Sequence, residues 1–281
     1  MAIFPLYKDF FRFLRAIRAG RDPWPVYQDF YIRPHRDFFR AYWAAFFPHL
    51  DVVTLQDRVR RVRPGHYTAL SDLIAGSDLS RKIANTLELC QKRLPVVSRP
   101  DVYLVVGFFS ADGFIVTLRG VPVIGIGLER YRDFHLLNII LAHEFCHFAR
   151  HLALGLDRSG RSERLDRKLI SEGLSVCFSR QVFPGRPLCD HLLMSRQRLN
   201  WCRRNEKMLL ALIQDQPHSD QLTPVLFGTG GFSDGIPPRA GMYLGYRLVE
   251  DALIERGPEA LADLLSIRDV SAIWPPASTS C

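Results

Sequence analysis

The 281-residue chain has little that would place it in a membrane or in an oxidising compartment. Its six cysteines are scattered, and no two of them have the CxxC spacing of a redox or zinc motif. The amino terminus lacks the basic, apolar and cleavage-site order of a secretory signal. No apolar run approaches the roughly 20 residues that a membrane-spanning helix needs. These absences predict a soluble cytoplasmic protein with reduced thiols.

A nucleic-acid-binding signature is also missing, although the net charge is +8. The densest basic run contains Val59 and Val62, which stand with Leu55 at the i, i+4 and i+7 spacing of a buried helical stripe. The arginines of this run then face water, so we expect no nucleic-acid partner. They are Arg58, Arg60, Arg61 and Arg63.

The pattern along the chain predicts a mostly helical α+β protein with a small sheet. Hydrophobic residues make up 47% of the chain and charged residues 23%, a globular balance. We expect a helical N-terminal region over 1–98 and a catalytic region over 99–281, together forming one compact unit. Strands are expected at 102–106, 114–118 and 121–128, as an antiparallel meander. The main helices are expected at 37–47, 52–62, 67–94, 134–152, 165–182 and 239–256.

Two segments leave two interpretations open. In the third strand Gly125 and Gly127 leave one face bare, which suits either an edge strand that pairs with an extended peptide or a strand packed under a helix. The first helix has an apolar face from Ile3 to Ile17 and a basic face opposite. Docking of the apolar face on the protein's own body is favoured over a weak peripheral membrane contact.

The chemical signal is His143-Glu144-Phe145-Cys146-His147, a His-Glu-x-x-His motif inside the apolar segment 134–152. Residues four apart project from the same helical face, so both imidazoles can reach one zinc ion. Glu144 lies beside them, where its carboxylate can take a proton from water activated by the metal and later pass it to a leaving amine. Two core histidines with an incidental glutamate would leave a costly charge in an apolar helix.

A catalytic zinc needs a third protein ligand. The extended metzincin pattern is absent, because Arg150 and Ala153 stand where its glycine and third histidine should be. The best candidate is Glu172 on the next helix, where Gly173 removes bulk at a close helix contact. Asp166, Glu163 and His151 are reserves. The alternative is that Lys168, Glu172, Ser175 and Ser179 form an ordinary solvent-facing stripe.

These motifs resemble the gluzincins, in which His-Glu-x-x-His on one helix is followed by a glutamate ligand on the next. More narrowly, the chain resembles the YjaZ-like family of predicted zinc-dependent proteases, through residues 141–147, 172–178 and 241–249. The resemblance implies a zincin-like fold, with His143, His147 and Glu172 as ligands and Glu144 as base and acid. Val176 departs from it, since gluzincins often have a carboxylate there to orient the second histidine. A backbone carbonyl or another side chain must then orient it.

The final helix carries Tyr243 and Tyr246 beside Gly241 and Gly245. Small residues four apart let this helix approach another closely, and Tyr246 is the preferred donor to the developing oxyanion. The alternative is that both tyrosines pack in the core with a solvated hydroxyl. Cys146 and Cys177 are expected to be small core residues and not metal ligands.

The sequence therefore predicts a zinc-dependent peptidase that acts on a peptide or protein substrate. Two rivals stay open: a zinc-binding regulatory or membrane-associated module with little activity, and a zinc hydrolase of another substrate. Retention of Glu144 favours an enzyme, because a structural zinc has no need of a general base and tends to have all four positions closed by protein ligands.

Overall fold

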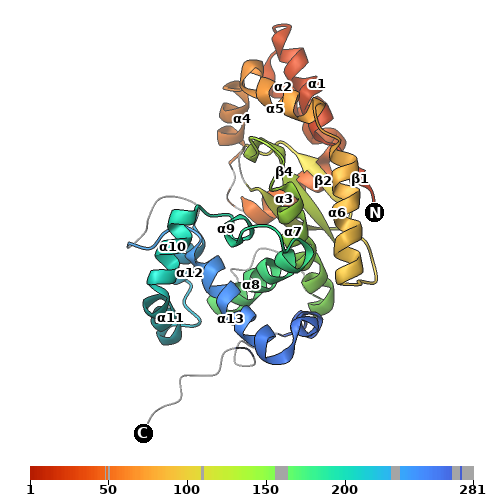
Figure 1. Cartoon of the computed structure of the whole chain (residues 1–281). Coiled ribbons are helices and arrows are strands. Elements are labelled where there is room, and N and C mark those ends of the chain that lie inside the picture. The colour runs from red at the N-terminus through yellow and green to blue at the C-terminus, as the bar shows by residue number, and fades with distance from the viewer. Residues whose placement is uncertain are drawn as a thin grey trace. The chain divides into compact units, whose positions relative to one another are not determined.

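The computed structural model describes residues 1–47, 49, 51–108, 111–155, 164–228, 235–267 and 273 (Figure 1). Its contacts form two compact units. The first comprises mainly Met1–Glu88 and Val96–Glu144, and the second Leu89–Pro95, Phe145–Gly155 and the described residues from Arg164 onward. The predicted division was at residues 98 and 99. These regions stay a prediction; by their contacts, the helices of the first 88 residues and the sheet belong to the same unit.

The sheet of the first unit is mixed, with the strand order β1-β2-β4-β3. Strand β2 pairs parallel to both β1 and β4, and β3 pairs antiparallel to β4. The predicted antiparallel meander is therefore wrong for β2, which lies on the far side of β4 from β3. Arg119 and Gly120 form the tight turn between β3 and β4, both with positive φ (51° and 78°). The strands are β1 (Ile3–Phe4), β2 (Val102–Val105), β3 (Gly113–Leu118) and β4 (Val121–Gly127).

Strand β4 is an inner strand, so the first of the two interpretations, an edge open to a peptide, is wrong. The bare face of β4 is filled from within the unit. A Cβ atom on Gly125 would overlap the ring of Phe114 on β3, and one on Gly127 would overlap the backbone oxygen of Ala111. The Phe114 ring also contacts Tyr42 of helix α3 (Arg36–Phe46), with ring centroids 5.1 Å apart. A helix therefore covers this region of the sheet, as the second interpretation required.

The amino-terminal helices of the first unit surround a cluster of buried aromatic rings. Phe10 of α1 (Tyr7–Arg18) packs on Tyr67, and Phe13 packs on Tyr27, with centroids 4.8 and 5.2 Å apart. The apolar face of the first helix thus docks on the protein itself. No described helix has the length and apolar character needed to cross a membrane. The remaining elements are α2 (Pro23–Tyr27), a π-helix (Gln28–Ile32), 3₁₀ turns at Arg33–His35, Pro64–Tyr67 and Leu128–Arg130, α4 (Val52–Arg60), α5 (Thr68–Ala75) and α6 (Leu79–Arg93).

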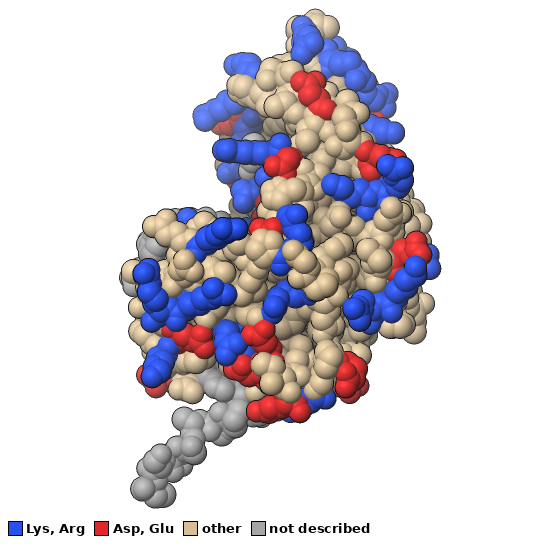
Figure 2. Space-filling model, in the orientation of Figure 1, with Lys and Arg blue, Asp and Glu red and all other residues tan. Residues whose placement is uncertain are grey.

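The basic run after Leu55 is solvent-facing, as predicted. Leu55, Val59 and Val62 are buried, whereas the arginines between and after them are exposed. Over the visible face of the molecule, acidic side chains lie among the basic ones (Figure 2). The excess of positive charge therefore does not form one continuous patch on that face.

Two long helices of the second unit, α8 (Leu165–Val182) and α13 (Ala240–Arg256), lie side by side (Figure 1). A Cβ atom on Gly173 would overlap the backbone oxygen of Gly245, and one on Gly245 would overlap that of Leu169. The glycines therefore allow backbone contact, which confirms the prediction that Gly173 marks a close helix approach. The shorter elements are α9 (Leu188–His191), α10 (Arg196–Arg204), α11 (Glu206–Asp215), α12 (Leu222–Phe227), a 3₁₀ turn (Pro258–Ala260) and α14 (Leu261–Leu264).

Candidate metal centre

The His-Glu-x-x-His motif lies in the middle of helix α7 (Leu137–Leu154), which is buried on nearly all sides. Leu141, Phe145 and Cys146 are completely buried. The polar side chains of the motif share this environment, since the whole residues His143 and Glu144 are only 5% and 7% exposed. Charged or polar groups at such a position need partners, which is what the motif predicts.

His147 has contacts from both ring nitrogens to neighbouring residues of α8. Its Nε2 lies 3.6 Å from Oε2 of Glu172, and its Nδ1 lies 3.2 Å from Oγ of Ser171. Helix α8 begins at Leu165, so the predicted second helix has the predicted bounds. The Nε2 atom of His147 is therefore directed at Glu172, the carboxylate that the sequence predicts as the third ligand.

One ligand atom from each of His143, His147 and Glu172 lies within 4.8 Å of the others. Two nitrogen or oxygen ligands of a tetrahedral zinc, each at about 2.0–2.1 Å, are roughly 3.4 Å apart, close to the 3.6 Å found between His147 and Glu172. Two imidazoles and one carboxylate also form a donor set typical of catalytic zinc, which keeps its fourth position open. The residues present fit a zinc ion.

The other candidates for the third ligand do not lie in this group of ligand atoms among the described residues. Asp166 is buried at the start of α8, where its carboxylate pairs with Arg164 (2.6 Å) and His218 (3.0 Å). His151 is buried on α7 but does not belong to the group of ligand atoms formed by the described residues. Glu163 lies outside the described residues.

The alternative interpretation of the Glu172 face, an ordinary solvent-facing stripe, is wrong. Ser175 and Ser179 on this stripe are completely buried. Lys168 is half-buried, with its ammonium 4.8 Å from the centroid of the Phe227 ring. The face is covered because the second unit packs further helices against α8, which a helical repeat in the sequence cannot reveal.

Glu144 lies against the first residue of strand β3. A Cβ atom on Gly113 would stand 2.7 Å from Cγ and 2.9 Å from Oε1 of Glu144. Burial raises the pKa of the nearby Tyr131 hydroxyl well above its usual value, and the charges of Asp112 and Glu144 add to this effect. In the sequence, Gly113 lies directly before the expected strand 114–118, where it is typical of a turn. The only available signal for its second role was a glycine that opens a strand.

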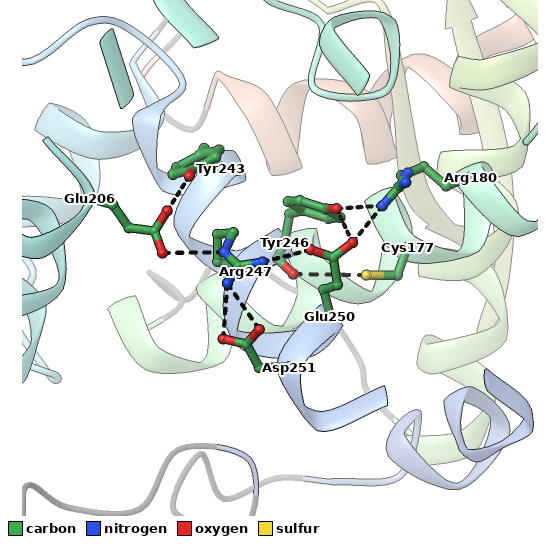
Figure 3. Close-up of polar contacts among 8 residues, drawn as sticks. All are labelled: Cys177, Arg180, Glu206, Tyr243, Tyr246, Arg247, Glu250 and Asp251. Atoms are coloured by element: carbon green, nitrogen blue, oxygen red, sulfur yellow. Dashed lines mark hydrogen bonds and ion pairs between the residues drawn. The ribbon is translucent and has the colours of Figure 1, made fainter. Parts of the chain in front are cut away.

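Tyr246 lies in a network of polar side chains on α8, α11 and α13 (Figure 3). Its hydroxyl donates to Glu250 and accepts a hydrogen bond from Arg180, and Arg180 also pairs with Glu250 at 2.7 Å. Arg180 is eight residues after Glu172 on α8, which is about 12 Å along the helix axis. The catalytic role of Tyr246 stays a prediction, and these contacts favour the alternative of a packed tyrosine.

Tyr243 has a different partner, because its hydroxyl donates to Glu206 of α11 (Figure 3). Burial and these carboxylate partners raise the pKa of both tyrosines. Cys146 and Cys177 are buried, as predicted, and neither belongs to the group of possible ligands among the described residues. Burial raises the pKa of the Cys177 thiol well above its usual value.

Two histidines on one helix and a glutamate on the next are typical of one class of metal-binding proteins. Comparison with known families then identifies the family. Residues 116–272, more than half of the chain, match the family described as predicted Zn-dependent protease (DUF2268). The chain belongs to this family, and the match includes the motif helix, Glu172 and the final helix. No curated protein and no solved structure gives a significant match.

Proposed function

We propose that this protein is a gluzincin-type zinc peptidase in which His143, His147 and Glu172 hold the metal. The observation that carries the proposal is the convergence of these three ligand atoms within 4.8 Å, next to a carboxylate on the same helix. When bound, a zinc ion would supply Lewis-acid chemistry, activating water and polarising a carbonyl group. In a member of the DUF2268 family, this set of metal ligands is best explained by a hydrolytic activity.

Glu144 would serve as general base and then as general acid. It follows His143 directly on α7, and it is 7% exposed, so its carboxylate is shielded from bulk water. In this role it takes a proton from the attacking water and passes the proton to the amine that leaves. Proton transfer by a positioned side chain typically contributes about a hundred- to ten-thousandfold in rate.

The sheet supports a peptide as the substrate. Strand β3 pairs with β4 on one side and has no other strand partner among the described residues. An extended peptide can add to such an edge through backbone hydrogen bonds. Because β3 begins at Gly113, beside the Glu144 carboxylate, a peptide bound there would pass close to the general base.

The test combines zinc content with cleavage of a proteome-derived peptide library by the purified full chain. We expect stoichiometric zinc and cleavage in the wild type, zinc without cleavage in Glu144→Gln, and loss of most zinc in His143→Ala or His147→Ala. Stoichiometric zinc in either histidine variant would contradict the ligand assignment. Zinc without cleavage in the wild type would favour a binding module, and cleavage of a non-peptide ester alone would favour another hydrolase.

A further inference from the structure

A histidine that binds zinc needs a group that orients its ring. Ser171, the residue directly before Glu172, lies with its Oγ 3.2 Å from Nδ1 of His147, the imidazole whose Nε2 faces Glu172. The two nitrogens of one imidazole are thus directed at two consecutive residues of α8.

We propose that Ser171 is the positioning residue of the zinc site, because its hydroxyl orients the ring of His147. Its Oγ accepts a hydrogen bond from the Nδ1–H of His147, which fixes the tautomer whose Nε2 lone pair faces Glu172. A neutral imidazole can bind a metal through only one nitrogen, so the partner of the other nitrogen decides which one it is. This inference rests on the zinc site of the proposed function.

Ser171 is held firmly enough for this task. It is 3% exposed, and its backbone carbonyl accepts a hydrogen bond of 3.1 Å from Oγ of Ser175, one turn later. Gly173, two residues on, is in backbone contact with Gly245 of α13, which restricts movement of α8. A serine in this position adds no charge, so it orients His147 without raising the basicity of the imidazole as a carboxylate would.

The experiment measures zinc affinity of the full chain by competition with a chromogenic chelator. We expect Ser171→Ala to bind zinc about ten- to a hundredfold more weakly than the wild type, the usual effect of removing such a partner. Ser171→Thr, which keeps the hydroxyl, should restore most of the affinity. The matched control is Ser175→Ala, because Ser175 is an equally buried serine of the same helix whose hydroxyl bonds a backbone oxygen.

Two further measurements distinguish the positioning role of Ser171 from a purely structural role of its hydroxyl. The melting temperature of the metal-free protein should fall similarly in Ser171→Ala and Ser175→Ala, since each loses a buried hydroxyl. Nitrogen NMR of the zinc-loaded wild type should show His147 protonated at Nδ1, with this proton exchanging faster in Ser171→Ala. Equal zinc affinity in Ser171→Ala and wild type, or a proton on Nε2, would overturn the proposal. Since zinc binding is the readout, a protein that binds zinc but cleaves no peptide would contradict only the proposed function.

Discussion

Glu172 and Asp166 are two acidic residues of the same helix with different surroundings. Glu172 faces His147, whereas Asp166 pairs with Arg164 and His218. Glu172→Ala should therefore weaken zinc binding by orders of magnitude, because it removes one of the three proposed protein ligands. Asp166→Ala should change zinc affinity little. A zinc titration checks both, and a larger loss in Asp166→Ala than in Glu172→Ala would reassign the ligand.

Gly113 is a residue whose missing side chain makes room for the carboxylate of Glu144. In Gly113→Ala the added Cβ would be 2.7 Å from Cγ of Glu144, so the carboxylate must move. Because a displacement of about 1 Å can cost a hundredfold in rate, we expect kcat to fall about a hundredfold with zinc content unchanged. Steady-state kinetics and metal analysis test this.

The control for Gly113→Ala is Gly65→Ala in the same unit, where the added Cβ would meet no atom within 4 Å. Wild-type kcat in Gly113→Ala would mean that the position of Glu144 does not depend on this glycine. Equal losses in both variants would point to a general effect of stiffening the chain.

The grouping of His143, His147 and Glu172 could be predicted at the residue scale, and the residues that contact this group and Glu144 could not. His143 and His147 share one helix, so the helical repeat alone places both on one face. Gly113 and Ser171 act through contacts with residues 31 and 24 positions away in the chain. No local pattern connects such pairs, because the fold brings them together.

At the scale of elements, helix α13 is held on α8 by backbone contact at the glycines and by the network around Tyr246. Tyr246→Phe removes two hydrogen bonds to Glu250 and Arg180 and leaves the Arg180–Glu250 pair in place. We expect a stability loss of about 1 kcal/mol and wild-type kcat. Denaturant unfolding and steady-state kinetics measure the two effects.

The opposite outcome has a distinct signature. If Tyr246 donates to the oxyanion, Tyr246→Phe should lower kcat about a hundred- to a thousandfold with little change in KM. Tyr243→Phe serves as the control, since its hydroxyl bonds Glu206 on another helix. Loss of kcat in Tyr243→Phe alone would move the role to that residue.

Strand existence could be predicted, but strand pairing could not. The alternation of side chains is the same in a parallel and an antiparallel strand, so the sequence of β2 contains no sign of its partner. The Arg119-Gly120 turn specifies the β3–β4 hairpin locally. The pairing of β2 with β4 depends on packing of the helices of the first unit on the sheet, which involves residues far apart in the chain.

At the scale of the whole molecule, a buried histidine should make stability depend on pH. His191 is completely buried, and its Nδ1 lies 2.9 Å from Oγ of Ser179. Burial, helped by the charge of Arg180, lowers the pKa of His191 to about 4. The unfolded chain takes up a proton below its own value of about 6.5 and the folded chain does not, so stability present above pH 6.5 is lost as the pH falls toward 4.

We expect the free energy of unfolding to fall by about 2 kcal/mol between pH 7 and pH 5 from this group alone. His191→Gln should be less stable at pH 7 and should lose less stability over that interval. Urea unfolding of the metal-free protein at both pH values measures the difference, with chelator present so that zinc binding does not contribute. An identical decrease in both proteins would show that His191 is not the sensitive group.

The sequence by itself determined the motif helix, the three residues that could hold a metal, the choice of Glu144 as the proposed base and the bounds of most long helices. These features depend on neighbours within a few residues, where the helical repeat and turn chemistry act. Only the tertiary structure decided the mixed order of the sheet, the burial of the Glu172 face and the partners of Tyr246, Gly113 and Ser171. Those features depend on which surfaces meet, and burial between distant segments is settled by packing of the complete chain.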